Sequence, residues 1–193
     1  MDPLTHYMAG YILGRRGNAG EAGIRVITLC ALLPDIDIIE VIGGLDLFYG
    51  LHRTVTHSLL SALVIALIMT AGFASWKGKN KALHILPWCL VGTLSHLFLD
   101  MFSYNTSFLS IFGVAAAQSK PAYLEGVQLF WPLSEARFSV VNLGMLSQES
   151  TNVMIIAIFC LFVGSMLGGT LKGSRPWSIW TDPIYARMKK NEY

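Results

Sequence analysis

Five histidine and aspartate side chains lie within or beside strongly apolar stretches of the chain, where ionisable groups are unusual. They are His6, Asp35, His57, His96 and Asp100. His96 and Asp100 are four residues apart, so on a helix both side chains project from one face and can hold one cation or bridge two. Burying such groups in an apolar segment costs free energy unless they are paired or bind something. We therefore predict that the five groups converge on one metal site.

The chemistry of these side chains limits which metals they suit. Imidazoles and carboxylates without thiolates favour zinc, at one or two ions, with manganese and iron as alternatives. Neutral imidazole and ionised carboxylate coexist near pH 7, so binding a cation would offset the cost of burying them. A single histidine–aspartate pair in a membrane helix is as often an interhelical hydrogen bond. Five groups at one predicted depth favour the metal site.

Polar residues next to the predicted ligands are candidates for supporting or catalytic roles. Asp37, Glu40 and His52 can each be a further ligand, a partner that orients an imidazole, or a base. Asp35, or Asp37 beside it, can orient an attacking water or accept its proton. Arg53 is either an interfacial cation or a clamp for an anionic substrate, and its place among the histidines favours the clamp. The predicted catalytic residues are therefore Asp35, Asp37 and Arg53.

The composition indicates that these residues are held by membrane helices. Of the 193 residues 53% are hydrophobic and only 13% are charged, against about 25% charged in soluble domains. We predict an all-α, polytopic membrane helical bundle of about four to five membrane segments. Segments 58–74, 83–102 and 153–171 are long enough to span a bilayer. Segments 4–13 and 24–42 form a shorter, partly inserted hairpin, because the first is short and the second is broken at Pro34.

The positions of the basic residues predict how the bundle is oriented. Most of the 14 lysines and arginines fall around residues 15–25, 77–81 and 172–190. If the segments alternate in direction, all three groups lie on one side, which the positive-inside rule makes cytoplasmic. The histidines and aspartates then gather at the opposite end. The sequence therefore predicts a multi-pass membrane protein with its site near the extracytoplasmic face.

The remaining segments are assigned by composition. Residues 103–152 are rich in aromatics and interrupted by Pro121 and Pro132, which favours an extracytoplasmic cap over the site, with a lipid-skimming loop as the alternative. Residues 1–173 would form the membrane-embedded domain, and residues 174–193 a cytoplasmic interfacial tail. Thr54 or Thr56 is the expected N-cap of the helix over 58–74, with His57 in its first turn.

Two observations exclude other classes of protein. The three cysteines, Cys30, Cys89 and Cys160, lie in apolar stretches without CxxC spacing, so we expect small core residues rather than ligands or disulfide partners. The formal charge of +2 is divided among separate loops, so no nucleic-acid partner is expected. The oligomeric state is left open.

Five motifs in order along the chain resemble those of a known family. They are THYMAG around His6, LLPDID at 32–37, HRTVTHS at 52–58, GTLSHLFLD at 92–100 and FWPLS at 130–134. Together they resemble the bacterial inner-membrane metal-dependent hydrolase family whose members include LexA-regulated proteins. The resemblance covers most of residues 1–140 and implies hydrolysis without defining a substrate.

The order of the predicted ligands is also distantly similar to that of zinc-dependent phospholipases C and fungal single-strand nucleases. On that resemblance, the five histidines and aspartates match positions that hold a zinc cluster. The chain departs from this pattern because its last histidine is His96, so the later histidine and glutamate pair is missing. One or two metal ions are therefore expected rather than three.

Residues and resemblance together lead to one main hypothesis and one alternative. The main hypothesis is a membrane-embedded metal-dependent hydrolase, phosphoesterase-like or phospholipase-like, whose partner is a membrane lipid or lipid-linked phosphorylated substrate. The alternative is a non-enzymatic membrane protein that binds or conducts a metal ion. An ion pathway needs polar groups that continue through both leaflets, and segments 60–74 and 155–163 offer few.

Overall fold

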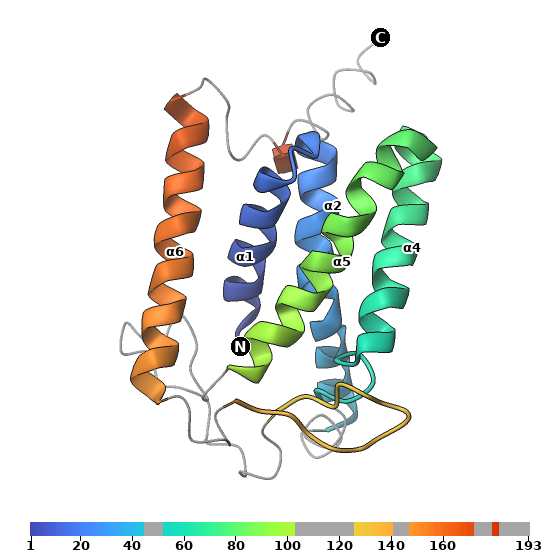
Figure 1. Ribbon diagram of the computed structural model, residues 1–193, viewed down its shortest axis with the longest axis vertical. Helices are drawn as coiled ribbons and strands as arrows, with labels where there is room; N and C mark the ends of the chain where they lie inside the picture. Colours follow the sequence, from blue (N-terminus) through green and yellow to red (C-terminus); the bar gives the residue numbers. More distant parts are fainter. Residues whose placement is uncertain (45–51, 103–125, 141–146, 172–178, 182–193) are drawn as a thin grey trace.

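A computed structural model describes residues 1–44, 52–102, 126–140, 147–171 and 179–181, and these residues form a bundle of helices (Figure 1). The main elements are α1 (Pro3–Arg16), α2 (Gly20–Leu32), the 3-10 helix η1 (Leu33–Gly43), α4 (Leu59–Lys77), α5 (Lys79–Met101) and α6 (Gln148–Leu171). The described residues contain no strand, only an isolated bridge between Val127 and Phe138. The predicted all-α fold is confirmed.

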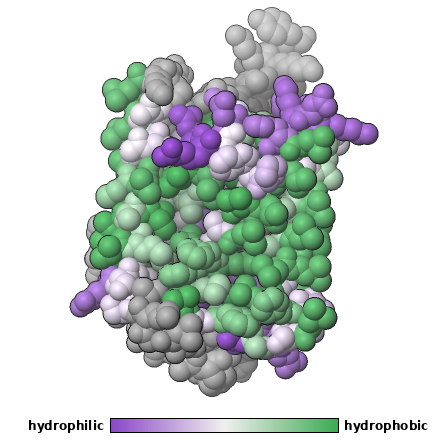
Figure 2. Space-filling view, viewed as in Figure 1, coloured by the Kyte–Doolittle hydropathy of each residue, from purple (hydrophilic) through white to green (hydrophobic). Residues whose placement is uncertain are grey.

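Three of the helices are long and apolar enough to cross a membrane, namely α4, α5 and α6. They correspond to the three spans predicted from the sequence. With 14 and 13 residues, α1 and α2 are about 20 Å long, shorter than a hydrocarbon core of about 30 Å. They form the shorter hairpin that was expected. Figure 2 shows a belt of apolar side chains across the middle of the molecule, with hydrophilic residues gathered above and below it.

Two glycines let the helices that carry histidines approach α2 closely. A Cβ atom on Gly10 would lie 2.7 Å from the Cβ atom of Ala31, and one on Gly92 would lie 3.0 Å from the carbonyl oxygen of Ile27. Small residues at such contacts allow helix backbones to pack tightly in membranes. His6 is one turn before Gly10 on α1, and His96 is one turn after Gly92 on α5. The close packing of both helices on α2 therefore brings the two imidazoles to the same place.

The helix break predicted at Pro34 is present, and it determines where the carboxylates that follow it lie. The α-helix ends at Leu32 and the chain continues as η1. Asp37 is buried and Asp35 is half-buried, whereas Ile36, Ile38 and Ile39 are exposed. The irregular turn thus directs both aspartates inward and the isoleucines outward.

The start of α4 differs from the sequence-based expectation. His57 precedes α4 instead of lying in its first turn, and the N-cap is Ser58, whose hydroxyl accepts a hydrogen bond from the Ser61 amide at 3.1 Å. The expected caps were Thr54 and Thr56. Thr56 is unavailable because its hydroxyl donates to Asp37 at 3.1 Å. This contact keeps the stretch before Ser58 outside the helix.

The described part of the predicted cap lies at the end of the bundle where the aspartates and histidines meet. The Gln128 amide donates to the carbonyl oxygen of Arg53, and the Leu59 amide donates to that of Leu129. The Val140 amide donates to the carbonyl oxygen of Met101 at the end of α5. Residues 126–140 therefore connect the turn before α4 to the end of α5. Residues 148–152, also predicted as part of the cap, form the start of α6 instead. Residues 103–125 and 141–146 lie outside the described residues.

The described residues of the tail contact α1, and two of the three cysteines are buried. Residues 179–181 are the described part of the predicted tail, and the Trp180 indole N–H donates to the Tyr7 hydroxyl at 2.9 Å. Cys30 and Cys89 are buried and unbridged, as expected. The expectation of a core position was wrong for Cys160, which is exposed. The reason is that α6 packs mainly on α1 and leaves most of its surface uncovered.

Candidate metal centre

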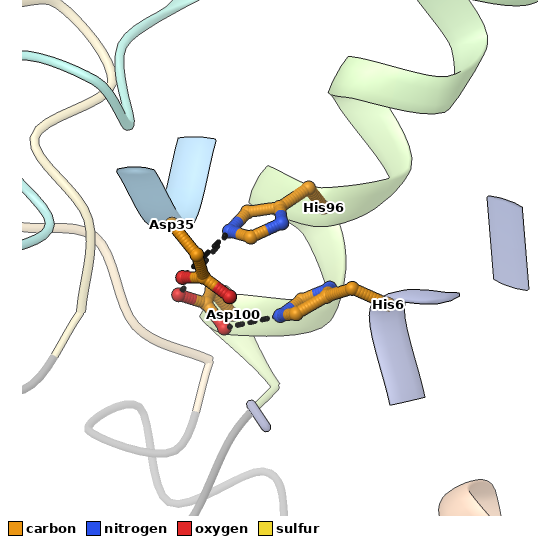
Figure 3. A group of neighbouring side chains, drawn as sticks. All are labelled: His6, Asp35, His96 and Asp100. Carbon is orange, nitrogen blue, oxygen red and sulfur yellow. Dashed lines mark hydrogen bonds and ion pairs between the residues drawn. The ribbon is translucent and has the colours of Figure 1, made fainter. Parts of the chain in front are cut away.

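The structure brings all five predicted ligands together in one buried cluster. His6, Asp35, His96 and Asp100 each offer a ligand atom, and these atoms lie within 4.8 Å of one another (Figure 3). His57 completes the cluster, with its Nε2 3.6 Å from Asp35 Oδ1 and 3.4 Å from Asp100 Oδ2. We call these five residues the polar centre. They come from α1, η1, the turn before α4, and α5.

The separations within the polar centre suit a small divalent cation. Four ligand atoms placed tetrahedrally about 2.1 Å from a zinc ion are about 3.4 Å from one another. The His96 Nε2 is 3.4 Å from Asp35 Oδ1 and 3.0 Å from the His57 Nε2. The His6 Nε2 is 3.2 Å from Asp100 Oδ1. The donor set and its spacing therefore fit a cation bound by imidazole nitrogens and carboxylate oxygens.

The outer nitrogens of two imidazoles have partners that direct the inner nitrogens toward the cluster. The His96 Nδ1 is 2.7 Å from the carbonyl oxygen of Ala31, which can only accept a hydrogen bond. His96 is therefore protonated on Nδ1, and its Nε2 can present a lone pair to a cation. The His57 Nδ1 faces the Thr56 hydroxyl at 3.0 Å and Asp37 Oδ2 at 3.4 Å. Such outer partners commonly orient metal-binding histidines.

The pKa shifts of His57 and Asp35 indicate that the polar centre favours positive charge. Burial alone would lower the pKa of His57, but Asp100, Asp35 and Asp37 together raise it to about 10. Burial would raise the pKa of Asp35, but hydrogen bonds from His57 and His96 hold it well below its usual range. The carboxylates therefore remain ionised, and a cation is the charge that they favour.

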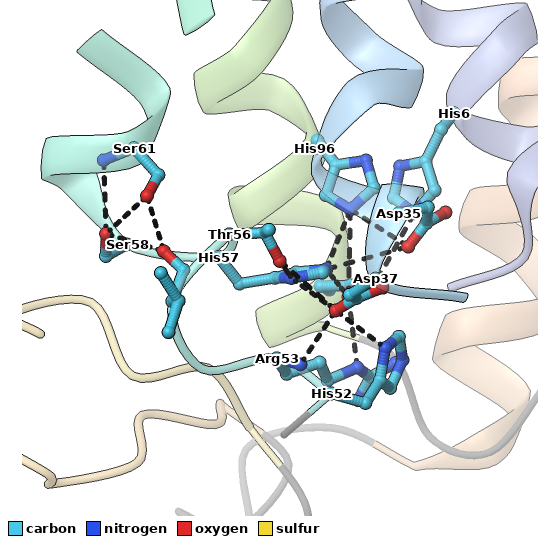
Figure 4. Close-up of polar contacts among 12 residues, drawn as sticks. His6, Asp35, Asp37, His52, Arg53, Thr56, His57, Ser58, Ser61 and His96 are labelled. Carbon is cyan, nitrogen blue, oxygen red and sulfur yellow. Dashed lines mark hydrogen bonds and ion pairs between the residues drawn. The ribbon is translucent and has the colours of Figure 1, made fainter. Parts of the chain in front are cut away.

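Asp37 contacts the Nδ1 atom of His57, whereas the Nε2 atom of the same ring faces Asp35 and Asp100 (Figure 4). The Asp37 Oδ2 is 3.0 Å from the His52 Nδ1 and accepts hydrogen bonds from the Thr56 hydroxyl and the Arg53 amide. Of the three roles left open for Asp37 and His52, this geometry favours that of partners that orient an imidazole. The side chain of Glu40 lies outside the described part of the chain.

Arg53 reaches the polar centre as predicted, but through a contact that the sequence did not indicate. Its Nε is 3.0 Å from Asp100 Oδ2, and the amino group of Met1 also pairs with this carboxylate. The backbone of Arg53 has φ +65°, a conformation that is costly for a residue with a side chain and often found at functional sites. It is held by the Asp37 carboxylate and by the Gln128 amide. Arg53 thus contributes positive charge beside a candidate ligand.

A second arginine near the polar centre was missed by the sequence reasoning. Arg137 neighbours Phe138, which pairs with Val127, and the next residue, Gln128, is bonded to Arg53. Burial lowers the pKa of Arg137, and so does the nearby charge of Arg53. One signal was available, because Arg53 and Arg137 both depart from the positive-inside pattern of the other basic residues.

The fold and the polar centre define an all-helical protein with three candidate membrane spans and a buried histidine and aspartate cluster able to hold a metal ion. A comparison with protein families identifies it further. The family model described as YdjM inner membrane protein matches residues 1–181, so the chain belongs to the YdjM inner membrane protein family. Neither the curated proteins nor the solved structures include a match to the chain.

Proposed function

We propose that the protein is a membrane-embedded metal-dependent hydrolase that acts on phosphoester bonds of a lipid or lipid-linked substrate. The observation that carries this proposal is the polar centre itself. Five ligand groups from four segments meet in a buried position, and the partners of His57 and His96 direct their Nε2 atoms inward. A purely structural hydrogen-bond network would not need three imidazoles and two carboxylates with such spacing.

The residues of the polar centre are the proposed ligands of one or two zinc ions. His6, Asp35, His57, His96 and Asp100 supply only nitrogen and oxygen donors, which also suit manganese or iron. When bound, such an ion supplies Lewis acidity, which lowers the pKa of a water to about 7 and polarises a phosphoryl oxygen.

The remaining polar residues have roles in binding and proton transfer. Asp35 Oδ2 has no hydrogen-bond partner among the described residues, so it can orient the attacking water and accept its proton. In the reaction the water oxygen bonds to phosphorus, the ester P–O bond breaks, and the departing alcohol oxygen takes up the proton. Arg53, with Arg137 nearby, would stabilise the negative charge that develops on the phosphoryl oxygens. Asp37 would act through His57.

The proposed location of the reaction follows from the basic residues. Arg15, Arg16 and Lys79 lie at the ends of their helices that are remote from the polar centre. The positive-inside rule makes that end cytoplasmic. The polar centre would then lie near the extracytoplasmic face of the bacterial inner membrane.

The proposal can be tested by metal analysis and by hydrolysis assays on the detergent-purified protein. Wild type should contain close to stoichiometric metal, and His96→Ala should lose most of it. His84→Ala is the matched control, because His84 lies on the same helix near the opposite end and is exposed. A panel of phosphomonoesters, phosphodiesters and phospholipids would then be assayed. Metal-replete wild type that hydrolyses none of them would favour the alternative, a non-enzymatic metal-binding protein.

A further inference from the structure

The five residues of the polar centre differ in how far they can be reached from outside. The side chains of His6, His57, His96 and Asp100 are at most 1% exposed, whereas that of Asp35 is 13% exposed. Among the five, Asp35 is therefore the side chain that a substrate can contact from outside the protein. The surface next to Asp35 consequently bears on what kind of molecule can approach.

An apolar groove of about 290 Å³ lies next to Asp35. It is formed by the start of α1, the last turns of α2 and the first turns of η1, and it is lined by Pro3, Leu29, Leu32, Leu33, Asp35, Ile36 and Ile38. Asp35 is the only charged residue among the described residues of this lining. We call this groove the chain groove. Its described lining suits a hydrocarbon chain, and Asp35 also belongs to the polar centre.

The surface around the chain groove is also apolar. Ile36, Ile38 and Ile39 on η1 are between 52% and 60% exposed, and Leu4 on α1 is 44% exposed. An exposed cluster of large aliphatic residues in a membrane protein is most stable against lipid rather than water. The chain groove therefore opens toward the hydrocarbon of the bilayer, so its occupant can enter sideways from the membrane.

We propose that the chain groove binds the hydrocarbon chain of an amphiphilic phosphate ester and directs its headgroup to the polar centre. This inference rests on the proposed hydrolase function, and it specifies the substrate as an ester with a long-chain alcohol or diacylglycerol-like leaving group. A water-soluble phosphate ester would make no use of an apolar surface beside Asp35. The positive charge of Arg53 and the apolar groove together complement the two parts of such a molecule.

A pair of substrates with the same headgroup tests the role of the groove. Purified protein would be assayed with a long-chain phosphatidic acid and with glycerol phosphate. The variants Leu29→Trp and Ile36→Trp fill the groove from two different elements, and Leu67→Trp places the same bulk on α4, where Leu67 is 49% exposed. The ratio of kcat/KM for the long-chain ester to that for glycerol phosphate should fall about tenfold in both groove variants, the loss expected when about two methylenes no longer bind. In Leu67→Trp the ratio should equal that of wild type.

A binding measurement separates failure of this inference from failure of the hydrolase proposal. Delipidated protein would be mixed with phosphatidic acid and examined by native mass spectrometry. Retention by wild type and Leu67→Trp, with loss in both groove variants, supports the chain groove even if no ester is hydrolysed. If wild type hydrolyses esters but the substrate ratio is unchanged in both groove variants, the groove has no role and the hydrolase proposal stands. Equal retention in all four proteins would likewise overturn the groove.

Discussion

The substitution Asp37→Asn tests whether the turn before α4 holds His57 as a ligand. Asn keeps the shape of the side chain and one acceptor oxygen but removes the negative charge. In the structure, Asp37 Oδ2 is 3.4 Å from the His57 Nδ1, 3.0 Å from the His52 Nδ1 and 3.1 Å from the Thr56 hydroxyl. The variant should therefore weaken the electrostatic interaction that orients the His57 ring, while a side chain of the same size still packs beside the ring.

The expected size of the effect follows from the position of Asp37, which contacts the proposed ligand His57 and not the proposed metal itself. Replacing a partner that orients a ligand typically costs 10-fold to 100-fold in metal affinity. This corresponds to about 1.4 to 2.7 kcal/mol. Replacing a ligand, as in His96→Ala, should cost considerably more, because it removes a metal bond outright. Metal affinity should therefore be lowest in His96→Ala, intermediate in Asp37→Asn and highest in wild type.

The assay is a competition titration. Metal-free protein would be prepared with a chelator, and zinc would be titrated in the presence of a chromophoric chelator of known affinity. Glu149→Gln is the matched control, since Glu149 is exposed in the first turn of α6. Zinc affinity of Asp37→Asn within twofold of wild type would refute the reasoning. So would an equal loss in Glu149→Gln, because the effect would then be due to charge in general.

Three further predictions concern the clamp, the helix packing and the topology. Arg53→Lys should keep its metal but lose about 10-fold to 100-fold in kcat/KM on any hydrolysed phosphoester, because lysine cannot donate two parallel hydrogen bonds; wild-type turnover would exclude the clamp. Gly10→Leu should lower the thermal unfolding temperature in detergent, since its Cβ would lie 2.7 Å from a side-chain carbon of α2. The expected cost is about 1 to 3 kcal/mol. Gly72→Leu should leave the unfolding temperature unchanged, because no atom lies within 4 Å of a Cβ at that position. In a cysteine-free background, a membrane-impermeant thiol reagent should label Glu135→Cys in intact cells and Lys79→Cys only after lysis, and equal labelling of both would contradict the orientation.

The convergence of the five ligands could be predicted because each is an ionisable residue in an otherwise apolar stretch. The basic loops provided an independent orientation, which placed His6, His57 and Asp100 at one end of the bundle. The structure agrees with this arrangement for the described residues. Whether these groups bind a metal stays a prediction.

Other features depend on contacts between distant segments, so local sequence could not supply them. Thr54, Thr56 and Ser58 are all good N-caps by residue type, and the choice of Ser58 depends on Thr56 being bonded to Asp37 across the fold. The position of Arg137 near Arg53 likewise depends on how residues 126–140 pair with each other and with the turn before α4.

The packing beyond the polar centre bears on the alternative that the protein conducts a metal ion. A conducting path would need polar groups that continue from the polar centre to the other end of the bundle. In the described residues, that part of the core is an apolar cluster made of Ile27, Cys30, Ala66, Phe73, Ala82, Ile85 and Cys89. The buried hydroxyls of Thr28 and Thr93 donate to carbonyl oxygens of the helices themselves. The buried Thr70 hydroxyl has no hydrogen-bond partner among the described residues, but it is a single neutral group rather than a set of ligands. An ion at the polar centre would therefore have the proposed ligands around it and no evident next position among the described residues.

This packing predicts that the protein retains a metal ion without transporting it. Proteoliposomes that contain wild type and a zinc-sensitive dye should take up zinc no faster than protein-free liposomes, while the protein itself keeps its bound metal. His84→Ala should behave in the same way. Zinc uptake that requires His96 would contradict the argument, because it would mean that the apolar cluster opens to let an ion pass. Retention without flux is what a resident catalytic ion requires, since an ion that moved on after each encounter could not polarise successive substrates.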